Sequence, residues 1–287
     1  MAYIIRYAEI GLKGKNRIIF EKKLIKNIKA RIPDSIVIKH FGRFYMYNNQ
    51  MEDGEIKNRL KTVFGIANFS KAIECEADME DIKEVVLKFV QEEIKNRNIK
   101  TFRVSTNRIE KKLKGSLEMD KELGAFVVEK TGLKVSLKEY DLNIGVEISD
   151  KIYLYKEKVE GPGGLPVGSE GKILGLLEDE DSMIACYLAM KRGCDLFPFV
   201  FDEMQKEKMQ KFIDKLQFFS PVELKLHVIL PEQLDEFAEK YDLHAIIVND
   251  RIESIRDDYR IATLRPLIGI SENEVKEIKQ FIESVKS

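Results

Sequence analysis

Four consecutive carboxylates stand at residues 178–181, where the chain reads Glu-Asp-Glu-Asp directly after an apolar stretch at 172–177. A strand, a tight turn and a helix in this order hold phosphate in many α/β domains, because backbone N–H groups at the helix N-terminus face the anion. Carboxylates oppose that use. At an effective dielectric of about 20, each one about 5 Å from a phosphate charge costs roughly 3 kcal/mol, whereas the helix terminus contributes about 1 kcal/mol. We therefore expect this turn to repel phosphate.

The acidic turn has two other interpretations. In the first, Asp181 is the N-cap of the following helix, and the other acidic residues lie favourably at its N-terminus. In the second, the clustered oxygens bind a divalent cation, although known cation loops space their ligands and interleave them with glycine. We expect the structural cap, and no metal site.

Composition indicates a globular protein with reduced thiols. Apolar residues make up 44% and charged residues 34% of the 287 positions, without an apolar run near the ~20 residues that span a bilayer. The N-terminus has no secretory signal pattern, so we expect a cytoplasmic protein that does not enter a membrane. The three cysteines, Cys75, Cys186 and Cys194, form no Cys-x-x-Cys pair, and the three histidines lack the spacing of zinc ligands.

Charge is unevenly distributed along the chain. Residues 1–160 carry 32 lysines and arginines against 25 acidic residues, whereas residues 161–287 carry 16 against 24. Residues 1–31 alone hold nine basic side chains and two acidic ones. This pattern is typical of a surface that binds a polyanion. A solvated, lysine-rich helix face would give the same count, so charge alone leaves both open.

The first block predicts a ferredoxin-like sandwich, with strands at 3–7, 35–40 and 44–47 and helices at 16–32 and 54–63. Asn16 is the expected cap of the first helix, whose apolar face would contain Ile19, Phe20, Leu24 and Ile28. The second block predicts helices at 79–95 and 116–131 and strands at 101–106, 134–137, 144–148 and 151–156. We place the boundary between the two blocks at residues 64 and 65.

The segment GPGGLP at 161–166 combines two strong breakers and predicts a second domain boundary. Beyond it, the pattern predicts strands at 173–177, 196–201, 223–230 and 245–248. Helices alternate with them: one that ends near residue 192, one at 204–216 and one at 232–241. Alternation of this kind predicts a doubly wound parallel sheet with ligands at the strand C-terminal ends. The expected fold is therefore a multidomain α/β and α+β chain with domains at 1–64, 65–160 and 161–287.

Six stretches together resemble one known family: RYAEIGLKGKNR, GIANFSKAIECEAD, TFRVSTNRIEKKL, GPGGLPVGSEGK, YLAMKRG and LRPLIGISENEV. They look like the tRNA 4-thiouridine synthetases, which are tRNA sulfurtransferases that also serve thiamine biosynthesis. The resemblance covers most of the chain. It implies a ferredoxin-like domain at 1–64, a THUMP domain that binds RNA at 65–160, and a PP-loop ATP pyrophosphatase-like domain at 161–287.

The resemblance, together with the basic residues, implies tRNA as the partner. The first cluster consists of Lys13, Lys15, Asn16 and Arg17, which lie next to two glycines. There the backbone and a helix N-terminus would approach a phosphate. A second cluster follows in the THUMP block, at Arg103, Arg108, Lys111 and Lys112. Contacts to phosphate give affinity with little sequence information, which suits the recognition of tRNA by shape. Asn107 stands where the family tends to have a basic residue.

The third block departs from the family. Members read Ser-Gly-Gly-x-Asp-Ser after the apolar strand, whereas here only Asp181 and Ser182 match, one residue earlier. We regard Leu176, Leu177, Asp181 and Ser182 as a remnant of the nucleotide site. Residues 203–241 contain no cysteine to carry sulfur, and the chain after Val248 does not resemble the family's Thr-Gly-Glu stretch. We predict no catalytic residue and no cofactor.

The leading hypothesis is a tRNA-binding protein without ATP pyrophosphatase or sulfurtransferase activity, acting as an adaptor for a separate modification enzyme. The alternative is an active sulfurtransferase that uses ATP and Mg²⁺. A third idea, a sensor in which the third domain binds another small molecule, is neither supported nor excluded by the sequence. Whether the protein forms a homodimer is also left open.

Overall fold

The computed structural model describes residues 1–7, 9–110, 115–256 and 259–285, and the chain divides into two compact units. The first unit consists of Met1–Ile5, Ile36–Asn49 and Phe69–Val159, and the second of Arg6–Ser35, Gln50–Asn68 and Glu160–Ser287. Within the described ranges, no helix is long and apolar enough to cross a lipid bilayer.

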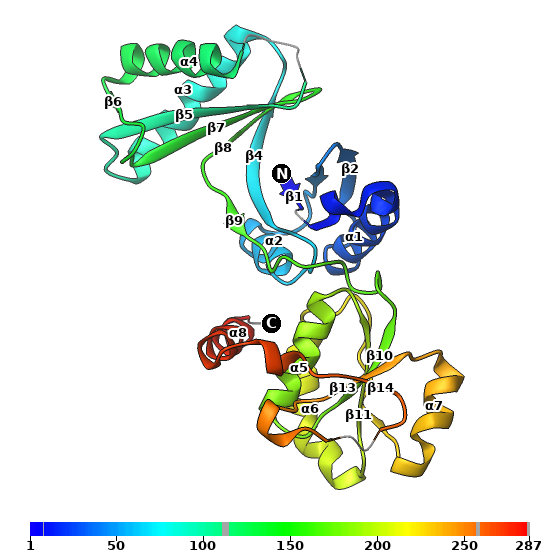
Figure 1. The fold of residues 1–287 in the computed structure, drawn as a ribbon. Coiled ribbons are helices and arrows are strands. Elements are labelled where there is room, and N and C mark those ends of the chain that lie inside the picture. The colour runs from blue at the N-terminus through cyan, green and yellow to red at the C-terminus, as the bar shows by residue number, and fades with distance from the viewer. Residues whose placement is uncertain (8, 111–114, 257–258, 286–287) are drawn as a thin grey trace. The chain divides into compact units, whose positions relative to one another are not determined.

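Among the described residues, one sheet of nine strands forms the body of the first unit (Figure 1). Its order is β2 (Ile36–His40), β3 (Arg43–Tyr47), β1 (Ala2–Arg6), β4 (Asn68–Cys75), β8 (Ile152–Tyr155), β7 (Leu142–Ile148), β5 (Thr101–Arg108) and β6 (Lys134–Val135), and β9 (Val159–Glu160) also pairs with β4. Helices α3 (Met79–Asn96) and α4 (Ser116–Thr131) pack on this sheet through one apolar core. β4 joins the strands of the first sequence block to those of the second.

A buried aromatic and acidic cluster connects β3 with β8 and β7, neither of which pairs with β3 in this sheet. The ring of Tyr45 on β3 stacks on Tyr153 of β8 with centroids 4.2 Å apart. The Tyr45 hydroxyl donates to Glu147 Oε1 of β7 at 2.9 Å, and Arg43 forms an ion pair with the same fully buried carboxylate. Burial, together with the charge of Glu147, raises the pKa of Tyr45, so its hydroxyl stays protonated and keeps donating.

The second unit contains a parallel sheet in the order β12 (His227–Val228), β11 (Asp195–Val200), β10 (Lys172–Leu176), β13 (Ala245–Ile247) and β14 (Ala262–Leu264). Strand alternation gives it two apolar faces. One face, with Ile173, packs against α5 (Glu180–Lys191), α6 (Glu203–Gln217) and α8 (Glu272–Ser284). The other face, with Leu174, packs against α7 (Leu234–Tyr241). The predicted doubly wound parallel sheet is confirmed.

Two helices from the first sequence block, α1 (Arg17–Arg31) and α2 (Asp53–Leu60), belong to the second unit. The buried Asn27 of α1 donates from Nδ2 to the carbonyl oxygen of Val167 at 3.0 Å, which ties the helix to the glycine-rich segment. Asn16 stands at the N-cap position of α1 as predicted, but its side chain makes no capping hydrogen bond. Ile19, assigned to the apolar face, is 63% exposed, whereas Leu24 and Ile28 are buried as predicted.

Other differences lie where strands are short. Of the strand predicted at 223–230, only His227–Val228 is a strand in the structure. The chain before it is held against the end of α6 instead, because the N–H of Leu224 donates to Gln217 Oε1 at 2.7 Å. Strands β4 and β14 and helix α8 were not predicted from the sequence. Helix α8 carried a signal, since Ser271 and Glu274 form a capping box at its start.

Candidate functional site

The acidic turn lies at the place where open parallel sheets usually bind ligands. β10 pairs with β13, Gly175 opposite Ile247, so the segments that leave these two strands run side by side. From β10 the chain proceeds outward to β11 and β12 on one side, and β13 and β14 lie on the other. The strand order therefore reverses between β10 and β13, and the crevice at such a reversal is the general ligand position of this architecture.

Ser182 and Asp179 satisfy several backbone donors of the turn. The N–H groups of Glu178 and Asp179 donate to Ser182 Oγ at 2.9 and 3.0 Å, and the N–H of Ser182 donates to Asp179 Oδ1 at 2.8 Å. The Ser182 hydroxyl, fully buried, donates in turn to the carbonyl oxygen of Asp179 at 2.6 Å. Asp179 thus caps α5 through a capping box, and the prediction that Asp181 is the N-cap is wrong. A carboxylate of the chain already occupies the helix N-terminus that would hold a phosphate.

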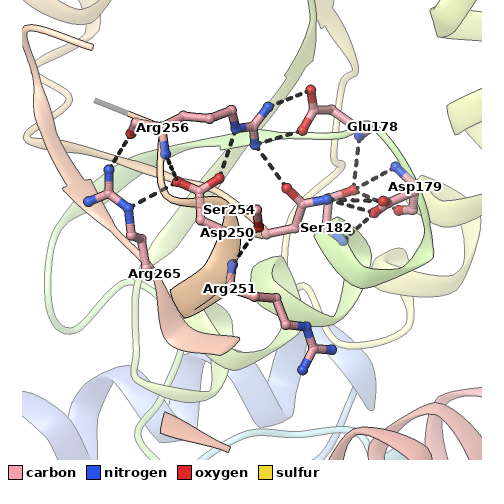
Figure 2. A network of polar contacts seen from close by, with 9 residues as sticks. Glu178, Asp179, Ser182, Asp250, Arg251, Ser254, Arg256 and Arg265 are labelled. Carbon is pink, nitrogen blue, oxygen red and sulfur yellow. Dashed lines mark hydrogen bonds and ion pairs between the residues drawn. The ribbon is translucent and has the colours of Figure 1, made fainter. Parts of the chain in front are cut away.

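Two arginines from the chain after β13 complete this arrangement (Figure 2). Arg256 forms a bidentate pair with Glu178, both distances being 2.9 Å, and its Nε donates to Asp250 Oδ1 at 2.8 Å. Arg265 donates from Nε to the other oxygen of Asp250 at 3.0 Å. Asp250 is 2% exposed. Burial alone would raise the pKa of Asp250, but hydrogen bonds from Arg256 and Arg265 outweigh it and hold that pKa below its usual value.

The remaining acidic residues of the turn also have partners. Arg251 Nη2 lies 2.9 Å from Asp181 Oδ2, and this hydrogen bond raises the pKa of Arg251. Lys279 of α8 pairs with Glu180, and Asn249 donates its amide to both oxygens of Asp179 at 3.0 Å. The turn was expected to repel phosphate, and the structure shows how its carboxylates are held: three are paired with cations, and the fourth caps a helix. We find no cluster of metal-ligating side chains in the described part of the chain.

The lowered pKa of Asp250 predicts how stability responds to acid. Its carboxylate contributes fully above the unfolded-state pKa of about 3.9, and the contribution is lost as pH falls through the lower folded-state pKa. The difference in melting temperature between the wild type and Asp250→Asn should thus be constant from pH 8 to about 5.5 and shrink below about pH 4. Thermal unfolding followed by circular dichroism measures it. A difference that widened in acid would contradict this assignment.

The surroundings of all three cysteines raise the pKa of the thiol. Cys186, on α5, is fully buried, and burial raises the pKa of its thiol to about 12. Burial and three nearby carboxylates raise the pKa of Cys75 to about 11. Burial, followed by Glu170 and Asp195, also raises the pKa of the half-buried Cys194. Nucleophilic cysteines need the opposite environment, because the thiolate is the reacting species.

The first predicted basic cluster lies on the 3₁₀ segment Glu9–Asn16 and on Arg17, the first residue of α1. The segment has a kink at Gly14, whose φ of 52° favours glycine. Two of its cations have acidic neighbours. Lys13 Nζ lies 2.6 Å from Glu170 Oε1, and Arg17 Nε lies 3.5 Å from Oε1 of the buried Glu21. Lys15 and Asn16 are exposed. The segment therefore presents a mixed surface in which Lys15 is the most accessible charge.

In the second predicted cluster, Arg103 is held by neighbours that the sequence analysis missed. Its Nε donates to Oδ1 of Asn143, the residue opposite it on β7, at 2.9 Å. Its guanidinium lies 4.2 Å from the ring centroid of Tyr140. Arg108 follows at the end of the same strand, whereas Lys111 and Lys112 lie outside the described residues. The two basic clusters belong to different compact units.

Comparison with known proteins gives consistent matches along the chain. The ThiI ferredoxin-like domain model matches residues 2–70, and the THUMP domain model matches residues 76–157. A probable tRNA sulfurtransferase of Alkaliphilus oremlandii is 30% identical, the alignment taking in 99% of this chain and 85% of that protein. One of Methanocaldococcus jannaschii is 31% identical, over 98% and 88%. One of Alkaliphilus metalliredigens is 38% identical over 72% of this chain and 56% of its own length.

Two solved structures share the fold. PH1313 from Pyrococcus horikoshii matches with a TM-score of 0.89 and 30% identity, covering 98% of this chain and 99% of that one. A 4-thiouridine synthetase, solved as an RNA complex with bound ATP, matches with a TM-score of 0.82 and 30% identity, covering 98% and 84%. The alignment with the Alkaliphilus oremlandii relative spans 332 positions, more than the 287 residues here. That relative therefore contains internal segments that this chain lacks.

Proposed function

This chain belongs to the tRNA sulfurtransferase family, and from that premise we propose that it binds tRNA but does not bind or activate ATP at the strand-end crevice. The proposal that ATP does not bind there rests on the hydrogen-bond network between Ser182, the acidic turn and Arg256. In this proposal the protein presents tRNA to a separate modification enzyme.

Binding of RNA is supported by the family matches and by the geometry of Arg103. The hydrogen bond to Asn143 and the stacking on Tyr140 engage Nε and one face of the guanidinium. They fix the side chain, so little conformational freedom is lost when its terminal amino groups pair with a phosphate. Lys13, Lys15, Asn16 and Arg17 supply a second phosphate-binding surface. Such contacts recognise the RNA backbone, and they weaken with salt because each one releases counterions.

Loss of the nucleotide site is supported by what ATP would have to displace. A phosphate at the start of α5 needs backbone N–H groups that now donate to Ser182 and Asp179. It would also meet Glu178, whose charge is balanced only while Arg256 stays in place. Breaking the internal hydrogen bonds costs about 1 kcal/mol each, and freeing the carboxylate adds repulsion. The turn thus serves as a structural link between β10, α5 and the chain after β13.

Loss of sulfur transfer is supported by the cysteines. Each of the three thiols has a raised pKa, and residues 203–241 contain no cysteine. A thiol that stays protonated neither attacks a sulfur donor nor carries persulfide efficiently. The names of the curated relatives favour the other candidate, an active tRNA sulfurtransferase; the alternative from the sequence adds the use of ATP and Mg²⁺. The following experiment separates the two.

The purified full chain should bind tRNA in a filter-binding assay and leave ATP intact. With millimolar ATP and Mg²⁺, amide hydrogen exchange at residues 177–183 and 249–256 should be unchanged, because a ligand that does not bind there cannot protect those amides. No pyrophosphate should be released when tRNA and a sulfur donor are added. The RNA-bound synthetase relative serves as the positive control. Protection of the turn by ATP, or pyrophosphate release, would make the active-enzyme function the correct one.

A further inference from the structure

A cavity of about 420 Å³ lies where β10, β11 and β12 begin, at the end of the parallel sheet away from the acidic turn. It exists because β12 is short: the pairing of β11 with β12 starts only at Phe199, opposite His227. In the described part of the chain, the edge of β11 that faces away from β10 has no strand beside it before Phe199. Helix α1 and the segment 220–225 form the other walls. We call this cavity the basic notch.

Lysines dominate the charged lining of the notch. Lys23 and Lys26, three residues apart on α1, join Lys172 at the start of β10, and all three act electrostatically on Asp195. A Cβ built on Gly168 would lie 2.8 Å from both Lys23 Nζ and Asp195 Oδ1, so the ammonium and the carboxylate converge beside this glycine. Three cations face one half-buried carboxylate, which leaves the site positively charged.

Of these three lysines, Lys172 is held by a hydrogen bond to the backbone. Lys172 Nζ donates to the carbonyl oxygen of Tyr241 at 3.1 Å. Further along the wall, Lys225 is balanced by Glu223 at 3.7 Å. Asp195, beside Lys23, balances one of the three lysine charges, and the neutral carbonyl of Tyr241 balances none. The notch therefore keeps an excess of positive charge, which α1 presents through Lys23 and Lys26. The Asn27 hydrogen bond to Val167 fixes that face of α1 against the wall of the notch.

Much of the remaining lining is apolar, and part of it is aromatic. Phe197 of β11 lies nearly parallel to the ring of His227, with an interplanar angle of 17°. Burial, together with the positive charges of Lys206 and Lys225, lowers the pKa of His227, so its ring is neutral at neutral pH. Val222, 57% exposed, and Pro221 line the rim. The notch thus combines a cationic wall with a flat apolar one.

We propose that the basic notch binds a nucleoside 5′-monophosphate, with its phosphate at Lys23 and Lys26 and its uncharged body against Phe197 and Val222. The volume falls within the range of small-molecule sites. A phosphate dianion balances the excess positive charge that Asp195 leaves. The same phosphomonoester occurs on a free nucleotide and at the 5′ end of an RNA. The proposal concerns a different end of the sheet from the acidic turn and holds whether or not the turn binds ATP.

Isothermal titration of the full chain with AMP, UMP, inorganic phosphate and adenosine tests this site. AMP and UMP should bind with one-to-one stoichiometry, phosphate at least about tenfold more weakly, and adenosine undetectably, because both walls contribute and the charge dominates. Lys23→Ala/Lys26→Ala should weaken AMP binding at least about tenfold. The control Lys22→Ala/Lys29→Ala removes the same charge from exposed positions of α1 outside the notch and should change affinity less than about twofold. No saturable AMP binding, or equal losses in both variants, would overturn the proposal.

Short RNAs with a 5′-phosphate or a 5′-hydroxyl then identify the source of the ligand. Displacement of AMP by the 5′-phosphorylated RNA alone supports the notch as a site for an RNA end. Displacement by neither RNA supports it as a site for a free nucleotide. If both RNAs displace AMP equally, the notch recognises the phosphodiester backbone, and the assignment to a phosphomonoester is wrong.

Discussion

Replacing Asp250 with asparagine should lower the melting temperature of the second compact unit by about 10 °C. The carboxylate is almost fully buried and accepts from the backbone N–H of Arg256, from Arg256 Nε and from Arg265 Nε. Removing one partner of a buried charge network costs about 3–5 kcal/mol, since the cations remain desolvated. Each ~1 kcal/mol shifts the melting temperature by about 2–4 °C in a unit of this size. Thermal unfolding monitored by circular dichroism gives the value.

Asp235→Asn is the matched control for that experiment. Asp235 carries the same charge in the same unit, but its side chain is half-exposed and lies 3.9 Å from a largely exposed Arg260. Pairs of this kind contribute about 0–1 kcal/mol, so the control should melt within about 3 °C of the wild type. If Asp250→Asn shifted the melting temperature no more than the control, the network would not be the structural link that we describe.

The second large effect concerns RNA. Arg103→Ala should weaken tRNA binding about tenfold or more, because a charged hydrogen bond to phosphate contributes about 1.5–3 kcal/mol. The slope of log affinity against log salt should fall by about one unit, corresponding to one phosphate contact. Filter binding at several salt concentrations measures both quantities. Arg97→Ala is the control, because Arg97 is an arginine of the same unit that pairs with Glu93 at the end of α3.

The positioning role of Tyr140 predicts a further pattern. Tyr140→Leu removes the aromatic face beneath Arg103 while keeping an apolar side chain. It should weaken tRNA binding less than Arg103→Ala and should add nothing in the double variant, because the tyrosine acts through the arginine. Additive losses would instead indicate that Tyr140 contacts RNA by itself. Unchanged affinity and salt slope in Arg103→Ala would remove this residue from the RNA surface.

Local patterns predicted most elements of the second unit because their apolar residues repeat regularly. The helix at 204–216 and the strands at 173–177 and 196–201 correspond closely to α6 (Glu203–Gln217), β10 and β11. The cap of α5 was misplaced by two residues. Asp179 and Asp181 are both acidic, and the choice between them depends on where β10 ends, which the sequence does not specify.

The partners of the acidic turn could not be found from sequence. Arg256 is 78 positions away from Glu178, and Lys279 is 99 positions away from Glu180. Charge counting treats these carboxylates as unpaired, because it contains no information on contacts between distant segments. The same limit hid Asn143, which meets Arg103 through the register of two parallel strands. Arg265 did lie in a stretch that carried the family resemblance, but only the fold shows that it binds Asp250.

The shared strand β4 has a consequence for cooperativity. The two family models divide the chain between residues 70 and 76, yet Asn68–Cys75 forms one strand with β1 on one side and β8 on the other. Separating the modules there would cut β4 and leave two unpaired edges, which tend to associate with other chains. The stacked Tyr45 and Tyr153 bridge the same junction. These strands therefore form a single cooperative folding unit, and the parts of the two modules that belong to the first unit would melt together in one transition.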